Sequence, residues 1–461
     1  MDQGMLWYRC PPNHFYVQLH GVIMRILRTV LAGTAATALA VAGSVYFVAS
    51  PASAAPPVGA VGTYTPLAPS RILDTRSGVG APKGIVGRGA TVHLQVNGRG
   101  GVPSSGVSAV VLNLTVTGTL ANGYLTAYPD GAAKPTASSI NFGKAATRAN
   151  SVTVAVGASG FVNIFQSSLG AHVIADVAGY YSGDEGAAVG STYIPVSPFR
   201  RHDTRDEPGP VEAHWWYQYA ITFDDPEIDA AVTAVAINLT AVNPVTGGYL
   251  TAWNGVGDPP AGVSALNYGK GGIWPNSATV PTATCDWIEC GLQAPMFGVY
   301  TSSDTDWLVD VFGVYFNDTV DGLKYKPITP QRILDTRSGS PLARGTRAVD
   351  APSTITPETE ALSLNVTAVA PTANTYLTVW PEFDRPVVST LNPFMGETVS
   401  NGTIVGLSET NQFQIYNNAG SVNVVADMGG LFEYWPSTEA GARSANSGPL
   451  HLTGGALRRN G

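Results

Sequence analysis

The chain has 461 residues, of which 44% are hydrophobic and only 13% are charged. Its 52 glycines and 33 prolines exclude a coiled coil, in which alanine, glutamate, lysine and leucine would dominate. The apolar content excludes disorder over the whole length, and a formal net charge of -8 argues against nucleic-acid binding. Many turn-forming residues between short apolar runs indicate an all-β protein with several domains.

The first 54 residues are interpreted as a targeting segment. Residues 24–28 carry two arginines, and an apolar run follows from Thr29 to Val48. The sequence Ala52-Ser53-Ala54 then offers an A-x-A site for a signal peptidase, so the exported protein is expected to begin at Ala55. Because the apolar run is longer than a usual signal core, an uncleaved membrane anchor is the alternative.

Residues 1–23 fit no usual signal layout, and we interpret them as a gene-model extension ahead of a true start at Met24. With or without cleavage, the remainder is expected outside the cytoplasmic membrane, in the medium or on the cell surface. Removal of the segment leaves Cys285 and Cys290, separated by four residues, as the remaining cysteines. In an oxidising compartment this pair predicts a disulfide, whereas a zinc site would need a second ligand pair.

One segment of the chain recurs three times, which indicates internal duplication. It runs from a tyrosine to the motif Asp-Thr-Arg and occupies residues 64–76, 193–205 and 325–337. Each repeat then carries an Asn-x-Thr triplet that starts at Asn113, Asn238 or Asn365. A Tyr-Leu-Thr segment follows at Tyr124, Tyr249 and Tyr376. Each repeat ends in an apolar run that holds one aspartate, which is Asp176, Asp310 or Asp427.

Within each repeat the residues follow the two-residue period of β-strands. Residues 109–116 are rich in β-branched side chains, and no helical stripe is visible after the signal segment. We therefore predict an all-β fold of three tandem β-sandwich repeats, with small barrels as the alternative. The predicted divisions are 1–54 (extension plus signal peptide), 64–182, 193–317 and 325–435 (β-sandwich repeats 1, 2 and 3), and 436–461 (a disordered tail).

The motifs R-[IL]-L-D-T-R and D-V-x-G-Y-[FY] resemble a tandem β-rich repeat of secreted and cell-surface actinobacterial proteins. In that family the repeat occurs in tandem or beside hydrolase, peptidase and carbohydrate-binding domains, and its own activity is unassigned. The resemblance spans residues 64 to about 435, but the second repeat has Arg201-His202 in place of Ile-Leu. It implies a location and a modular role, and it supplies no reaction.

The recurring Asp-Thr-Arg motif favours a structural role over a catalytic one. In an extended segment, Asp74 and Arg76 would point to one face, where a guanidinium binds a carboxylate through two hydrogen bonds. A buried Asp176 would also need a cationic or hydrogen-bonding partner. We predict structural clamps that tie the first and last strands of each repeat. Their members are Asp74, Arg76, Asp203, Arg205, Asp335 and Arg337, together with Asp176, Asp310 and Asp427.

No catalytic residue, cofactor or metal site is predicted. The histidines after residue 54 occupy no repeat position twice, and G-x-S-x-G, H-E-x-x-H and Walker motifs are absent. The acidic segment Asp224–Asp229 offers oxygens for calcium, but its spacing matches no defined calcium loop. A solvated acidic turn is the alternative, and whether this loop holds calcium stays open.

Three tryptophans of the second repeat are the candidate ligand-binding residues. Trp216 is expected on the outer face of its strand, and Trp274 and Trp287 lie in loops that the other repeats lack. Tryptophans in such places stack on sugar rings or anchor protein contacts, although they also simply cover long loops. Core packing is expected instead for Trp215, Tyr217, Tyr219, Trp253 and Trp380.

These observations predict a secreted or cell-surface protein of the cell envelope that has a structural or binding role without catalytic activity. The alternatives are a carbohydrate-binding protein acting through the second repeat and an unrecognised extracellular hydrolase. The expected partners are cell-wall or extracellular polysaccharide, or other surface proteins. Nucleic acid is not expected as a partner, and a membrane is expected only through an uncleaved signal segment.

Overall fold

The computed structural model describes residues 59–434, apart from 224, 286–293 and 383, and the backbone of residues 456–460. Within this part of the chain the architecture is almost entirely β, as predicted. It consists of three units that begin and end with long strands: the first unit (residues 64–182), the second (192–316) and the third (323–434). The targeting segment, including Met24 and Ala55, lies outside the described residues.

The first unit is a sandwich of two antiparallel sheets. Its inner sheet has the order β1 (Tyr64–Asp74), β9 (Gly170–Ser182), β4 (Val107–Thr117) and β7 (Arg148–Ala155), with the short β2 (Val86–Gly87) paired to β9. Its outer sheet has the order β3 (Thr91–Gln95), β8 (Phe161–Gln166), β5 (Gly123–Pro129) and β6 (Ile140–Phe142).

The second unit repeats this plan with additions. Its inner sheet has the order β10 (Thr192–Asp203), β18 (Asp306–Phe316), β12 (Val232–Val242) and β15 (Ile273–Pro281). Its outer sheet has the order β14 (Leu266–Tyr268), β13 (Gly248–Trp253), β17 (Pro295–Thr301), β11 (Trp215–Ala220) and β25 (Ala456–Asn460), and β16 (Ala283–Thr284) pairs with β17. A short helix, α2 (Pro226–Ala231), precedes β12.

The third unit uses one long strand in both of its sheets. Its inner sheet has the order β19 (Leu323–Asp335), β24 (Gln412–Tyr434), β21 (Thr359–Val369) and β23 (Thr398–Gly406). The first half of β24 also pairs with β20 (Leu342–Asp350) and β22 (Leu377–Trp380), which form the outer sheet. A single pair, Tyr193 and Leu323, joins the inner sheets of the second and third units.

Each unit holds its own hydrophobic core between its two sheets. Strand β8 illustrates why, because buried and half-buried residues alternate along it as the strand period requires. Val162 and Ile164 of that strand are fully buried in the core of the first unit. The alternation therefore places one face of each outer sheet against the core and leaves the other face toward solvent.

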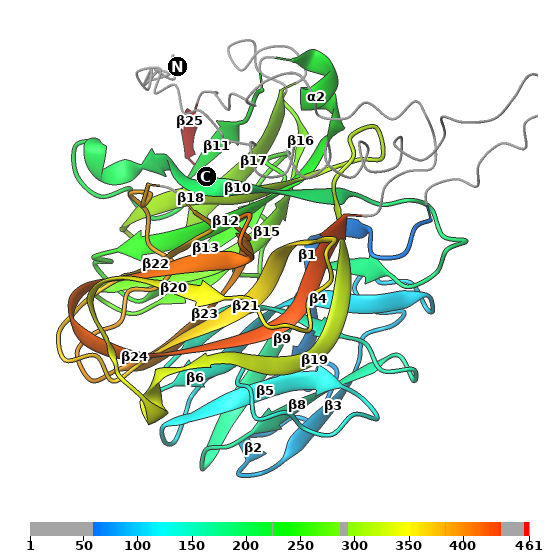
Figure 1. Ribbon diagram of the computed structural model, residues 1–461. Helices are drawn as coiled ribbons and strands as arrows, with labels where there is room; N and C mark the ends of the chain where they lie inside the picture. Colours follow the sequence, from blue (N-terminus) through cyan, green and yellow to red (C-terminus); the bar gives the residue numbers. More distant parts are fainter. Residues whose placement is uncertain (1–58, 224, 286–293, 383, 435–455, 461) are drawn as a thin grey trace, which may run out of the picture.

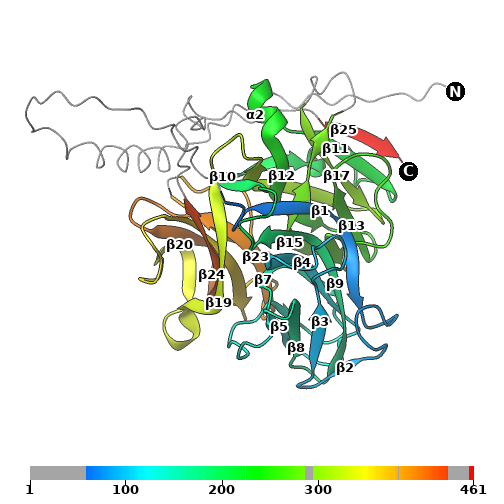
Figure 2. The same cartoon turned by 90° about the vertical axis from the view of Figure 1, so that its right-hand side faces the viewer.

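The three sandwiches are arranged around a common centre and not in a row (Figures 1 and 2). The edge strands β7, β15 and β23 of the three inner sheets each contact both of the others. The outer sheets lie at the periphery, with β5 and β8 of the first unit opposite the second unit in Figure 1. Three tandem repeats thus enclose one central junction.

The prediction of a disordered tail is wrong for residues 456–460. This segment forms β25 and pairs antiparallel with β11, with Trp216 opposite Arg459. Strand β11 would otherwise be an edge of the outer sheet, and an edge strand offers unpaired backbone groups to any extended segment. Residues 435–455 lie outside the described part of the chain.

Candidate functional site: the junction of the three units

Six buried or half-buried asparagines form three hydrogen-bonded pairs at the junction, which we call the asparagine ring because they connect the units in a closed cycle. In each bond, the amide nitrogen of one asparagine donates to the side-chain oxygen of an Asn-x-Thr asparagine in another unit. The bonds join Asn276 to Asn113 (3.0 Å), Asn401 to Asn238 (2.8 Å) and Asn150 to Asn365 (2.9 Å). They run from the second unit to the first, from the third to the second and from the first to the third, so the ring is closed. The Asn-x-Thr triplets are therefore contacts between units.

Six aromatic rings fill the junction beside this ring of asparagines. Three are the tyrosines that open the repeats, and three come from the closing strands: Tyr64, Tyr193 and Tyr325, with Tyr181, Tyr315 and Phe432. The hydroxyls of Tyr181 and Tyr315 are 2.7 Å apart, which links the first and second units directly. Burial raises the pKa of all five tyrosines above the usual range. These hydroxyls therefore stay protonated.

Glycines in the closing strands make room for the opening tyrosines. A Cβ atom added to Gly179, Gly313 or Gly430 would lie 1.9–2.3 Å from ring or hydroxyl atoms of the tyrosine in the same unit. Each tyrosine hydroxyl donates instead to the backbone carbonyl that precedes the glycine, at 3.0–3.1 Å. The glycine in the D-V-x-G-Y motif is thus required by the close approach of a ring.

An arginine-aspartate cluster ties the first strand of each unit to the last. Arg71 donates to Asp176 through Nε (2.8 Å) and Nη2 (3.0 Å), and its Nη1 lies 3.4 Å from Asp74. Arg76 binds the same Asp74 through Nε (3.0 Å) and Nη2 (2.8 Å). The same pattern recurs with Arg200, Asp310, Asp203 and Arg205, and with Arg332, Asp427, Asp335 and Arg337.

Sequence reasoning missed the central members of these clusters, which are Arg71, Arg200 and Arg332. They open the R-x-x-D-T-R segment in all three repeats, and this repetition was the available signal. The expected extended geometry of Asp-Thr-Arg is also wrong. Asp203 and Asp335 cap short 3-10 helices, and their carboxylates accept from the backbone N–H of Arg205 and Arg337. A cap aims the carboxylate back at the following residues, so the ion pair forms without an extended backbone.

Burial divides the carboxylates of the clusters into two kinds. The hydrogen bond from Arg337 lowers the pKa of Asp335 to about 2, and Arg76 likewise lowers the pKa of Asp74. In the closing strand of the second unit burial acts in the opposite direction, and it raises the pKa of Asp310 to about 6. Burial also raises the pKa of Asp176.

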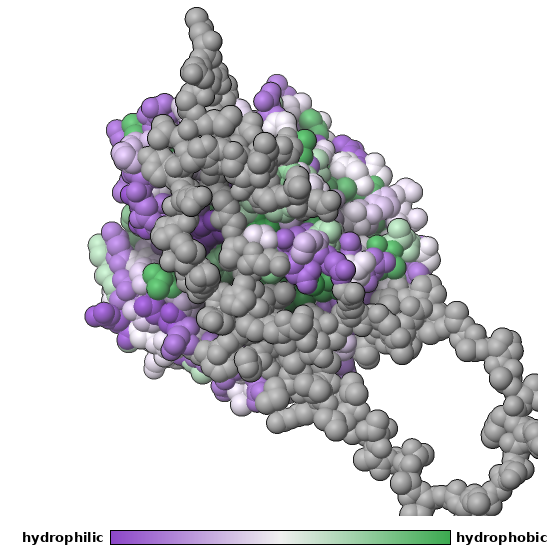
Figure 3. Space-filling view, turned by 90° about the horizontal axis from the view of Figure 1, so that it is seen from above, coloured by the Kyte–Doolittle hydropathy of each residue, from purple (hydrophilic) through white to green (hydrophobic). Residues whose placement is uncertain are grey.

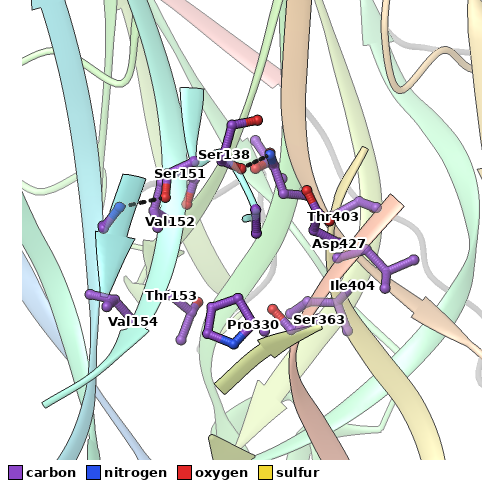
Figure 4. A pocket seen from close by; sticks show the side chains of 18 of the residues that line it. Ser138, Ser151, Val152, Thr153, Val154, Pro330, Ser363, Thr403, Ile404 and Asp427 are labelled. Carbon is purple, nitrogen blue, oxygen red and sulfur yellow. Dashed lines mark hydrogen bonds between the residues drawn. The ribbon is translucent and has the colours of Figure 1, made fainter. Parts of the chain in front are cut away.

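Equivalent pockets separate the clusters of one unit from the outer sheet of the next. Their volumes are about 80 Å³ between the third and first units, 30 Å³ between the first and second, and 10 Å³ between the second and third. Figure 4 shows the largest, where Asp427 and Pro330 face Ser138, Ser151 and Thr153 of the first unit. Hydroxyl groups and one buried, arginine-paired carboxylate give this pocket hydrogen-bonding capacity. The largest of these three pockets, at about 80 Å³, has room for a few water molecules.

The predicted tryptophan site does not assemble on the surface. Trp216 is only 7% exposed and packs edge-to-face against Trp253. The expected loop position of Trp274 is wrong, because this residue lies in strand β15 and pairs with Ala241. Its half-buried ring lies 4.1 Å from the guanidinium of Arg148, which also binds Glu397, so all three units meet there. Trp287 lies outside the described residues. Both described tryptophans are thus packing residues.

The other sequence predictions have different outcomes. Tyr217, Tyr219, Trp253 and Trp380 are buried as predicted, and Trp215 packs against the second core. Cys285 is buried, but Cys290 lies outside the described residues, so the disulfide stays a prediction. In the acidic segment, Asp225 caps α2 and Asp229 accepts from Thr222 and Phe223. Asp224 is not described.

Two findings concern metal and membrane binding by the described residues. They include no group of three or more histidine, cysteine, aspartate or glutamate residues able to hold a metal ion. No helix among them is long and apolar enough to span a membrane.

His202 is a candidate reactive side chain that the repeats do not share. Its Nδ1 lies 3.0 Å from the Tyr219 hydroxyl, and its Nε2 lies 3.4 Å from a carboxylate oxygen of Glu207. The ring is buried, and its Nδ1 is engaged within the unit.

Comparisons with known proteins give no family. No protein-family model and no curated protein matches the chain. Among solved structures, one described as the triple jelly roll fold and turret assembly in an archaeal virus has 8% identity, covering 81% of this chain and 90% of that one, with a TM-score of 0.17. An atomic structure of Sulfolobus turreted icosahedral virus has 9% identity, covering 82% and 92%, also with a TM-score of 0.17. Scores of this size say nothing further about this chain.

Proposed function

We propose that this chain is a non-enzymatic structural or binding protein that works on the cell surface or outside the cell. The observation that carries the proposal is which partners the repeated polar residues bind. The repeated aspartates bind arginines of their own unit, and the repeated asparagines bind asparagines of another unit. Polar groups that satisfy one another in this way hold a fold together and leave no free acid or base at the repeated positions.

The expected location rests on the sequence. The basic and apolar lead with its A-x-A site supports export, and the resemblance to repeats of secreted and cell-surface actinobacterial proteins supports the same compartment. The two alternative functions have less support. Glycan binding through Trp216 and Trp274 conflicts with their packing. A hydrolase would need an accessible base, whereas His202 is buried and its Nδ1 lies at hydrogen-bond distance from Tyr219.

A binding and turnover experiment tests this proposal. The exported protein is incubated with purified cell walls and, separately, with extracellular polysaccharide, and the bound fraction is measured after washing. The same preparation is assayed against broad esterase, peptidase and glycosidase substrates. We expect retention on at least one fraction without turnover. Turnover that is abolished by His202→Ala would instead support the hydrolase.

A further inference from the structure

Each unit carries one pair of aromatic rings at the same place in its outer sheet. The first pair is Tyr124 with Phe165, the second is Tyr249 with Tyr300, and the third is Tyr376 with Tyr416. Their ring centroids lie 6.2, 6.2 and 6.0 Å apart, and their interplanar angles are 41°, 45° and 50°. The three pairs therefore share one geometry, although one position holds phenylalanine in the first unit.

The pairs lie on the solvent side of the outer sheets. All six side chains are half-buried, whereas the residues that alternate with them, such as Leu125 and Ile164, are fully buried in the cores. Strands β5 and β8, which carry the first pair, lie at the periphery of the molecule in both views (Figures 1 and 2). In the view of Figure 3, the coloured hydrophobic residues are scattered among hydrophilic ones.

A cationic or imidazole side chain accompanies each pair. The ammonium of Lys134 lies 4.7 Å from the ring centre of Phe165, and the guanidinium of Arg385 lies 4.1 Å from that of Tyr416. In the second unit, Nδ1 of His214 lies 2.8 Å from the Tyr300 hydroxyl. All three side chains are exposed. These basic groups adjoin the rings although the chain as a whole carries a formal charge of -8.

We propose that the three aromatic pairs are equivalent binding sites for an acidic polysaccharide. Aromatic rings pack against the apolar face of a sugar ring, and tyrosine hydroxyls hydrogen-bond to its hydroxyl groups. Because Lys134 and Arg385 already lie over the rings of the second member of their pairs, the sugar is expected to pack against the first member, which is Tyr124, Tyr249 or Tyr376. Exposed Lys134 and Arg385 supply positive charge that attracts carboxylates of the polymer, and the exposed imidazole of His214 offers a hydrogen-bonding group. The inference rests on the proposed binding function and gives it a substrate class. It also spreads binding over all three units instead of the second alone.

The rigid junction makes the three sites act together. Because the units are held around one centre, a polymer that binds one pair stays close to the other two. Three sites of low individual affinity can therefore together retain the polymer strongly. The sites are not equal in charge, since Glu382 and Asp384 precede Arg385 in the chain and Glu212 lies two residues before His214. The first pair is therefore expected to contribute most.

Affinity electrophoresis of the full chain in gels that contain polygalacturonate tests the proposal. Retardation is compared for the wild type, for Tyr124→Ala, Tyr249→Ala and Tyr376→Ala, and for the triple variant. Each single change should weaken retardation a few-fold, and the triple change should weaken it by about 10²-fold, because avidity is lost with the sites. Val387→Ala and Met395→Ala, at surface positions that are 84% and 68% exposed, are the matched controls and should behave as the wild type.

The conservative variants separate stacking from a general loss of stability. Tyr249→Phe and Tyr376→Phe keep the rings and should keep most of the retardation, and all variants should melt within a few degrees of the wild type. Equal retardation of the triple variant and the wild type would overturn the proposal, as would a wild type that polygalacturonate does not retard. Retardation in gels with neutral dextran as strong as that with polygalacturonate would overturn the acidic specificity.

The two proposals fail in distinguishable ways. A protein that binds purified cell walls but ignores polygalacturonate keeps the proposed function and loses this inference. Cell-wall binding that survives in the triple variant has the same meaning. A protein that binds neither cell walls nor extracellular polysaccharide loses the binding role itself.

Discussion

The junction and the outer sheet faces are both built from residues that recur in every unit, yet their environments are opposite. At the junction, Asn150, Asn276 and Asn401 are fully buried and bind asparagines of other units. On the outer faces, the aromatic pairs are half-exposed beside basic side chains. Repetition alone therefore does not identify a functional residue. Burial and the identity of the partner separate the residues that close the fold from those available to a ligand.

The largest effect is expected from Arg332→Ala in the full chain. Arg332 binds Asp427, which is only 3% exposed, and also reaches the Thr136 carbonyl of the first unit. Its removal leaves a buried carboxylate unpaired, which costs about 3–5 kcal/mol of unfolding free energy. Urea unfolding followed by tryptophan fluorescence measures the loss. A variant as stable as the wild type would show that the arginine-aspartate cluster does not stabilise the junction.

A smaller loss is expected from Gly313→Ala. The added Cβ would lie within 2.2 Å of the Tyr193 ring, and overpacking of this kind costs roughly 1–3 kcal/mol. Gly87→Ala, in strand β2, is the matched control, because its added Cβ would meet no atom within 4 Å. Thermal melting of the two variants should separate them by several degrees. Equal melting temperatures would mean that the aromatic cluster has room to rearrange.

The pH dependence of stability distinguishes the buried from the capping carboxylates. Burial raises the pKa of Asp310 to about 6, so its favourable contribution is present below about pH 4 and is lost as the pH rises through 6. Asp310→Asn should remove that decline. Arg337 lowers the pKa of Asp335 to about 2, so this contribution is present above about pH 4 and is lost as the pH falls through 2. Melting curves of wild type, Asp310→Asn and Asp335→Asn between pH 2 and 7 test both signs.

The smallest effect is expected from Arg337→Ala. Its side chain is 48% exposed, and exposed ion pairs contribute about 0–1 kcal/mol. Because Arg332 still faces Asp335 at 3.4 Å, the carboxylate keeps a cationic neighbour. Urea unfolding of Arg337→Ala and Arg332→Ala under the same conditions compares the two losses of unfolding free energy directly. A loss from Arg337→Ala as large as that from Arg332→Ala would place the main clamp in the Asp-Thr-Arg motif.

The sequence predicted the strands well and the junction poorly, for physical reasons. Alternation of polar and apolar residues depends only on neighbours in the chain, so the sandwich plan followed from local patterns. The partner of Asn113 is Asn276, 163 residues away in another unit, and no local pattern reports such a contact. Trp274 looked like a surface residue of a long loop because its cover, Arg148, belongs to the first unit.

The repeated tyrosines also show that sequence patterns do not reveal contacts between residues distant in the chain. Tyr124, Tyr249 and Tyr376 were visible as a repeated motif, but the sequence did not reveal that they lie on the solvent face beside a second ring. That partner is Phe165, Tyr300 or Tyr416, on a neighbouring strand in each unit. Single-copy tryptophans attracted the binding hypothesis instead, because tryptophan is prominent at binding sites in general.

The central claim is that the closed junction makes the three repeats fold and unfold as one cooperative unit. Differential scanning calorimetry of the full chain tests this claim most directly. If the asparagine ring and the aromatic cluster couple the units, the chain unfolds in one transition whose calorimetric enthalpy equals the van't Hoff enthalpy. Asn276→Ala, at the contact between the first and second units, should lower the midpoint temperature of that single transition without splitting it. Separate transitions for the units, with Asn276→Ala moving only one of them, would contradict the claim.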